Sequence, residues 1–137
     1  MGLGLDSSAL IDAERKRVSV SELLERLEAV HGETEFSISA VTAMELEHGF
    51  HRALSAELAI RRRRYIDEVF AVLPTHPFNR GMGLLAGEID AGLKKAGIVV
   101  ATADLLIGVT ALYYGNGIGT ANIRHFRMIP GLKVLPL

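Results

Sequence analysis

The chain contains no cysteine, and neither sign of charge is in clear excess. The lack of cysteine excludes a disulfide framework, a thiolate metal site and a cysteine nucleophile. Fifteen lysine and arginine residues stand against 16 aspartate and glutamate residues, so the formal net charge is −1. This balance excludes binding to nucleic acid through an overall basic charge, and any such binding needs a local patch.

Long apolar runs are also lacking, although 49% of the residues are hydrophobic. No run approaches the ~18 residues that a membrane-spanning helix needs. The first residues, MGLGLDSS, have no basic region and reach an acid too early for a signal peptide. Together with the lack of cysteine, this favours a cytoplasmic location. The 137 residues fit a single domain, 1–137, with a core of its own.

Apolar residues follow two different periods along the chain. Helical spacing predicts helices over 20–31, 41–49, 50–68, 80–96 and 103–114. Short apolar or alternating runs predict strands over 2–5, 35–39, 70–73, 118–121 and 132–135. Ser39 or Thr42 would cap the second helix, Asn79 the fourth and Thr102 the fifth. Strands that alternate with helices predict an α/β domain with a mostly parallel sheet of about five strands.

Polar residues stand where the predicted strands end and the predicted helices begin. Asp6 ends the first strand, and Asn122 follows the fourth. Glu45 lies in the helix after the second strand, and Asp104 in the first turn of its helix. Ligands of parallel sheets bind beyond the carboxyl ends of the strands, so we expect these side chains to converge there. Three carboxylates in one cleft need a cation, and Mg²⁺ or Mn²⁺ prefers oxygen ligands and activates water for attack on phosphorus.

Each of these four residues also has a structural interpretation. Asp6 and Asn122 are of the type that occupies turns at strand ends. Glu45 stands three residues after Thr42, which fits a capping box. Asp104 fits the general preference for acids in the first turn of a helix. The joint placement of the four favours a metal site, while each residue taken alone leaves both interpretations open.

The stretches that carry these residues are GLDSSALID, SISAVTAMELEHG, ATADLLIGVTAL and GTANIRHFRMIPGLKVLPL. In these stretches, and in their order, the chain resembles the PIN-domain ribonucleases, and most closely the VapC-like toxins of bacterial toxin–antitoxin pairs. The resemblance implies a PIN-like three-layer α/β/α fold and a Mg²⁺- or Mn²⁺-dependent endoribonuclease. It also implies RNA as substrate, a cognate antitoxin protein as partner, and a homodimer.

The resemblance assigns roles to individual residues. Asp6, Glu45 and Asp104 would be the metal-binding carboxylates, and Asn122 would complete the catalytic set. Ser8 would orient Asp6 or bond a metal-bound water. Asn122 stands where many relatives carry an acid, and a neutral amide weakens a second metal position. We therefore expect one metal, with a second recruited by RNA phosphate.

Further polar residues lie in or near the fourth segment. Thr120 would belong to the site, and Arg124 and His125 are placed to contact substrate phosphate, although His125 also fits a structural role. Asp90 fits either an outer acid of the site or a solvated helix face. The run Arg61–Arg64 spreads around its helix, so RNA contact, antitoxin contact and a solvated face all remain open.

Two other function classes remain possible on the sequence alone. The first is a catalytically weak or inactive module that binds RNA or a partner protein, which the neutral Asn122 keeps open. The second is a phosphatase with an aspartyl nucleophile, which also begins with a strand that ends in aspartate. Such a phosphatase usually has a second acid two residues on, where this chain has Ser8.

Overall fold

Five parallel strands form the centre of the structure, a computed structural model that describes residues 2–137. The strands are β1 (Leu3–Leu5), β2 (Phe36–Ser39), β3 (Thr75–His76), β4 (Gly117–Thr120) and β5 (Val134–Pro136). Their order in the sheet is β3-β2-β1-β4-β5, and each neighbouring pair is parallel. The carboxyl ends of β1, β2 and β4 therefore meet at one edge, as the sequence predicts.

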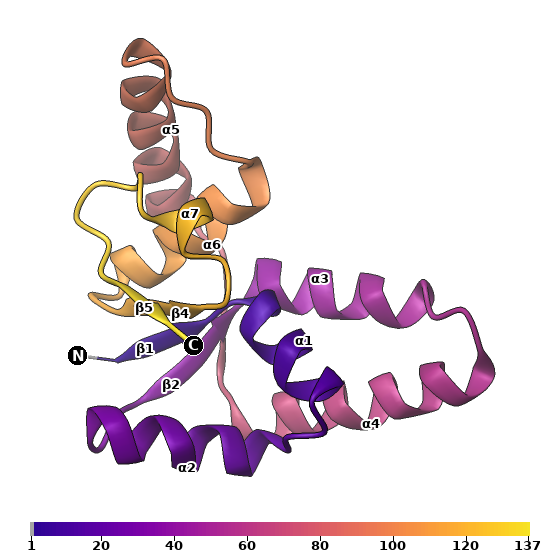
Figure 1. Ribbon diagram of the computed structural model, residues 1–137. Coiled ribbons are helices and arrows are strands. Elements are labelled where there is room, and N and C mark those ends of the chain that lie inside the picture. The colour runs from indigo at the N-terminus through magenta and orange to yellow at the C-terminus, as the bar shows by residue number, and fades with distance from the viewer. Residues whose placement is uncertain (1) are drawn as a thin grey trace.

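Helices cover both faces of this sheet (Figure 1). They are α1 (Ser7–Arg15), α2 (Val20–His31), α3 (Ala40–His51), α4 (Ala56–Val72), α5 (Arg80–Lys95), α6 (Thr102–Tyr113) and α7 (Ile123–Phe126). α1, α2 and α4 lie on one side of the sheet, and α5, α6 and α7 on the other. α3 and α4 form a hairpin that projects sideways beyond the strands. The α/β/α layers and the parallel sheet confirm the predicted fold.

Each face of the sheet has its own apolar cluster. Side chains of a strand alternate between the two faces of the sheet, so Leu3 and Leu5, which are two positions apart in β1, point to the same face. This is the face of α1, α2 and α4, where Leu10 and Val69 also pack. Ile118 of β4 packs in the second cluster, with residues from α5, α6 and α7. Burying a side chain of this size contributes about 1.5–3 kcal/mol. Packing on both faces therefore holds the central strands in place beneath the site edge.

Two of the predicted helix caps are confirmed, and one is wrong. The Ser39 hydroxyl caps α3 by accepting from the backbone N–H of Thr42, at 2.9 Å. The Asn79 side chain caps α5 by accepting from the N–H of Met82. Thr102 is instead the first residue of α6, whose cap residue, Ala101, makes no side-chain hydrogen bond. Thr102 therefore lies inside the helix and does not cap it.

The prediction of a helix over 50–68 and a strand over 70–73 is wrong. α3 continues to His51, and α4 begins at Ala56 with the Ser55 hydroxyl as its cap. α4 then runs on to Val72, because Ile66, Val69 and Leu73 repeat at helical spacing and face the core. The strand is the two-residue β3, which begins after Pro74.

The sequence prediction also omitted two helices. In α1, Asp6 is the cap, and Leu10 and Ala13 are buried at helical spacing. α7 has four residues, which is too short for periodicity to reveal. The last strand, β5, begins two residues after its predicted start at residue 132. In the described part of the chain, no helix has both the length and the hydropathy that crossing a membrane requires.

Candidate functional site

Asp6 lies directly after β1 and is the most enclosed acid of the site, with 3% of its surface exposed. The hydroxyl of Ser8 lies 2.8 Å from both carboxylate oxygens, and that of Thr120 donates to Oδ2 at 2.7 Å. The backbone N–H of Ala9 donates to Oδ1 at 3.0 Å. Donors from α1 and β4 therefore fix the carboxylate at the sheet edge, and they include the predicted supporting residues Ser8 and Thr120.

The environment of Asp6 makes its charged form costly. Burial raises the pKa of the Asp6 carboxyl above its ordinary value, and the hydrogen bonds from Thr120, Ala9 and Ser8 offset only part of this rise. The nearby Asp104 carboxylate raises the pKa of Asp6 further. The two acids, 98 positions apart in the sequence, are thus brought close enough to repel each other electrostatically.

Asp104 lies in the first turn of α6, as predicted, and is partly buried. Its Oδ2 lies 3.1 Å from Nδ1 of His125, which comes from α7. Burial raises the pKa of Asp104, and His125 lowers it in part. His125 therefore contacts the carboxylate of Asp104 and helps to position it. The sequence alone does not predict this contact between α6 and α7.

Glu45 lies on α3, one turn beyond the start of the helix, and does not act in its cap. Its Oε1 accepts a hydrogen bond from the Ser7 hydroxyl at 2.8 Å. Within residues 2–137, no three acidic or histidine side chains lie close enough together to hold one metal ion. The structure therefore brings Asp6 and Asp104 together, while Glu45 is turned to Ser7. The sequence analysis did not select Ser7, although this residue directly follows Asp6 and therefore lies at the same edge of the sheet.

Asn122 and Arg124 follow β4 at the same edge of the sheet. Asn122 is exposed at the start of α7, and its side chain makes no capping hydrogen bond. Its backbone N–H donates to the Thr120 hydroxyl at 2.8 Å, which links it to the oxygen that supports Asp6. Arg124 is exposed on α7 and faces solvent. These positions are open to a ligand that approaches from outside.

The donor set suits a hard divalent cation. Asp6 and Asp104 offer carboxylate oxygens, and the groups around them are hydroxyls and backbone amides. Two desolvated carboxylates, one of which raises the pKa of the other, are stabilised by a cation placed between them. Among the described residues, Glu45 does not lie close enough to Asp6 and Asp104 for one cation to contact all three predicted carboxylates as they stand.

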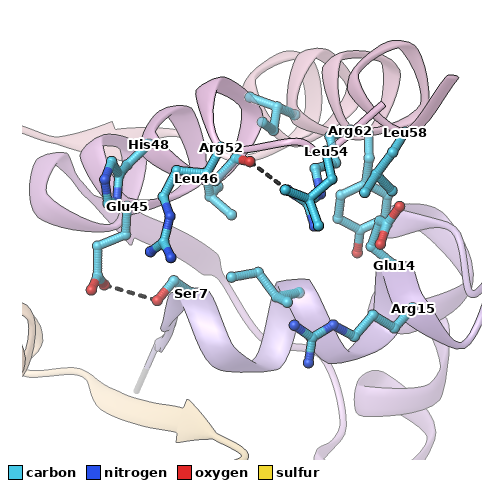
Figure 2. Close-up of a pocket in the computed structure, with 14 residues that line it drawn as sticks. Ser7, Glu14, Arg15, Glu45, Leu46, His48, Arg52, Leu54, Leu58 and Arg62 are labelled. Atoms are coloured by element: carbon cyan, nitrogen blue, oxygen red, sulfur yellow. Dashed lines mark hydrogen bonds between the residues drawn. The ribbon is translucent and has the colours of Figure 1, made fainter. Parts of the chain in front are cut away.

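A groove of about 480 Å³ begins at Ser7 and Glu45 and leads away from the two aspartates. It runs between α1 on one side and α3 and α4 on the other (Figure 2). Arginine side chains reach its far end, and its walls are partly apolar. No pattern along the chain predicts this groove, because three separate helices build it.

The arginine run and Asp90 have structural partners. Arg61 pairs with Glu14 of α1 at 2.7 Å, and Arg63 pairs with Glu47 of α3 at 2.7 Å. Arg62 donates to the backbone carbonyl of Gly49. These contacts tie α4 to two other helices.

Asp90 pairs with Lys94 one turn further along α5, at 2.8 Å. This contact fits the solvated helix face more closely than an outer acid of the site.

The family model of the PIN domain matches residues 4–129. The chain belongs to the PIN domain family. The matched range includes Asp6, Asp104 and every other residue of the candidate site.

Relatives within the family cover nearly the whole chain. Ribonuclease VapC1 of Rickettsia felis is 30% identical over 135 residues, covering 98% of this chain and 96% of that protein. Ribonuclease VapC1 of Methanocaldococcus jannaschii is 32% identical over 137 residues, covering 95% of this chain and 84% of that protein. These PIN proteins confirm the resemblance to VapC-like toxins.

A solved structure shows the same fold. The crystal structure of VapBC2 from Rickettsia felis, bound to a DNA fragment from its promoter, contains a chain that matches with a TM-score of 0.85. The match covers 100% of this chain and 99% of that chain, at 23% sequence identity. At this identity the similarity concerns the fold.

Proposed function

We propose that this protein is a Mg²⁺- or Mn²⁺-dependent endoribonuclease that acts in the cytoplasm as the toxin of a toxin–antitoxin pair. The observation that carries the proposal is the buried Asp6 beside Asp104, at the carboxyl edge of a parallel sheet. The PIN family membership and the two relatives named as VapC ribonucleases support RNA as the substrate.

In this proposal each residue of the site has a defined task. Asp6 and Asp104 would hold the metal, and Glu45 would join them after a movement of its side chain. The bound metal supplies an activated water and stabilises charge at the attacked phosphorus. Ser8 and Thr120 keep the Asp6 carboxylate oriented, and His125 does the same for Asp104. The exposed Asn122 and Arg124 contact the RNA, and Arg124 pairs with a phosphate.

A cognate antitoxin and a second copy of the chain are the proposed protein partners. A solved structure with this fold, the toxin–antitoxin complex from Klebsiella pneumoniae, supports an antitoxin partner. Apolar side chains exposed on and after α5, including Leu84 at 71% and Val99 at 79%, support a homodimer.

The experiment that tests the metal site is calorimetric titration with Mn²⁺ at neutral pH. We expect wild type to bind Mn²⁺ and Asp6→Asn to lose the binding heat while its thermal transition stays within a few degrees. The thermal transition holds because asparagine caps a helix as well as aspartate does. Asp12→Asn is the matched control, since Asp12 lies on the same helix, paired with Lys16 at the surface. Equal binding by wild type and Asp6→Asn would contradict the proposed site.

A catalytically weak or inactive binding module is the second candidate function. It is favoured by two observations, the hydrogen bond that turns Glu45 to Ser7 and the neutral Asn122. An assay of RNA cleavage with Mn²⁺ separates the two candidates, because only the nuclease produces fragments that disappear in Asp6→Asn. The aspartyl phosphatase is disfavoured, since hydrogen bonds occupy both oxygens of Asp6.

A further inference from the structure

The last part of the chain carries positive charge with no acid to compensate it. Asp104 is the last acidic residue of the sequence, and residues 105–137 contain two arginines and one lysine. The whole chain has a net charge of −1, so this stretch is a basic segment in a balanced protein. Both arginines, Arg124 and Arg127, lie on or directly after α7, beyond the carboxyl end of β4. α7 thus carries the kind of local basic patch that a protein without overall positive charge needs for binding nucleic acid.

The inner side of α7 is packed firmly against the domain. Phe126 and Ile129 are buried, with 0% and 2% of their surfaces exposed, and they belong to the apolar cluster that includes α6. A Cβ on Gly108 of α6 would lie 2.5 Å from the Ile129 side chain, so the glycine permits this close packing. The packing fixes α7 and turns its opposite side outward.

The outer side of α7 presents two arginines and two apolar side chains to solvent. We call it the α7 face and define it by Ile123, Arg124, Arg127 and Met128. Arg127 and Met128 follow Arg124 by three and four positions, a spacing that places side chains next to one another on a helix. Among the residues that the structure describes, no carboxylate pairs with either arginine. Ile123 and Met128 are 39% and 41% exposed, so the α7 face combines uncompensated charge with apolar surface.

The α7 face adjoins both aspartates of the candidate site. The backbone N–H of Asn122, directly before α7, donates to the Thr120 hydroxyl, which in turn donates to Asp6. His125 of α7 lies 3.1 Å from Asp104. A strand that is cleaved at these acids must cross an adjoining surface. This placement favours RNA over an acidic protein segment as the ligand of the two arginines.

We propose that the α7 face binds the RNA strand beside the scissile bond. Arg124 and Arg127 take two backbone phosphates, and Ile123 and Met128 lie under a base. Surfaces that bind single strands combine cationic side chains along the backbone with side chains on which the bases pack. The inference rests on the proposed ribonuclease function, and it adds Arg127, Ile123 and Met128 to the residues that contact the substrate.

The test is fluorescence anisotropy with a short, labelled oligouridine, in EDTA so that no metal-dependent cleavage occurs. The face variant is Arg124→Gln/Arg127→Gln. Its control, Arg64→Gln/Lys133→Gln, also removes two exposed charges, one from α4 on the other side of the sheet and one from the start of β5. We expect the face variant to bind on the order of tenfold more weakly, with a dependence of log K on log salt that is shallower by about 1.4, since each phosphate contact on a single strand contributes about 0.7.

A third variant, Met128→Ala, tests the apolar part without altering charge. Met128 is exposed, so the thermal transition should stay within a few degrees of that of wild type. We expect the variant to bind the oligouridine severalfold more weakly with an unchanged salt slope, because salt screens charges and not apolar contacts. Unchanged binding in Met128→Ala would overturn the base contact.

Two other results would overturn the proposal as a whole. Wild-type affinity and salt slope in Arg124→Gln/Arg127→Gln would do so, and this is the result expected if the α7 face binds an acidic protein segment instead. An equal loss in Arg64→Gln/Lys133→Gln would do so as well, since positive charge anywhere on the surface would then be enough.

A cleavage assay with Mn²⁺ separates this inference from the proposed function. Arg127→Gln should raise the KM for the oligouridine and leave kcat near that of wild type, because Arg127 contacts the strand away from the scissile bond. If wild type cleaves RNA and Arg127→Gln has an unchanged KM, only the assignment of the α7 face fails. If wild type neither binds nor cleaves RNA, the ribonuclease function fails, and the α7 face fails with it.

Discussion

At the scale of single residues, Asp6 has two roles that act in different charge states. As the cap of α1 it accepts a hydrogen bond from Ala9, which an asparagine oxygen would do equally well. As a candidate metal ligand it needs its negative charge, which burial and Asp104 make costly. A substitution that keeps the shape and removes the charge therefore separates the two roles, and the same holds for Asp104.

Asp104→Asn should weaken metal use without preventing folding. The carboxylate is lost, but asparagine keeps the size of the side chain at a partly buried position in α6. We expect the Mn²⁺ concentration for half-maximal RNA cleavage to rise on the order of ten- to a hundredfold, as for other losses around metal sites. The measurement is a Mn²⁺ titration of cleavage at fixed RNA, with the surface variant Asp90→Asn as control. An unchanged Mn²⁺ dependence would contradict a metal-binding role for Asp104. It would favour the structural interpretation, an acid in the first turn of α6.

At the scale of elements, the sequence predicts most helices and strands but not where α3 ends and α4 begins. Phe50 and Leu54 continue the apolar spacing of α4, and this made one helix appear to begin at residue 50. In the structure Leu54 is exposed on the turn, and the Ser55 hydroxyl starts α4. The periodicity cannot tell an apolar residue that packs in the core from one that lines a groove, so this boundary is visible only in three dimensions.

Arg61→Met should destabilise the protein because it leaves Glu14 without its partner. Glu14 is buried, and the 2.7 Å contact with Arg61 joins α1 to α4. We expect a loss of about 2 kcal/mol in the free energy of unfolding, measured by urea denaturation. Arg64→Met on the same helix is exposed and should stay within about 0.5 kcal/mol of wild type. Adding Glu14→Gln to Arg61→Met should recover most of the loss, and an equal loss in the double variant would contradict this account.

At the scale of the whole molecule, the parallel sheet explains why the site could be predicted in part. Asp6 and Thr120 stand at the ends of β1 and β4, so their meeting at one edge follows from topology whatever the details of the helices. Asp104 comes to this edge from the first turn of α6. The contacts of Glu45 with Ser7 and of His125 with Asp104 depend on side-chain orientation across separate elements. No periodicity along the chain encodes those orientations.

Stability of the metal-free protein should depend on pH through the site acids. Both Asp6 and Asp104 have raised pKa values in the folded state, so between the ordinary and the raised pKa the folded protein binds more protons than the unfolded chain. Their contribution to the free energy of unfolding therefore falls as pH rises through that window. Glu47, whose pKa is lowered by Arg63, contributes in the opposite direction, so total stability alone does not isolate the site.

The difference in the free energy of unfolding between Asp6→Asn and wild type isolates the contribution of Asp6. In EDTA we expect the variant to gain stability relative to wild type as pH rises above the ordinary aspartate value of about 3.9, and the gain to level off above the raised pKa. Urea denaturation from acidic to neutral pH measures it, and Asp12→Asn should show no such trend. A gap that is constant with pH, or that widens on acidification, would contradict the buried charge. Adding Mn²⁺ at neutral pH should narrow the gap, because a cation offsets the charge that only wild type carries.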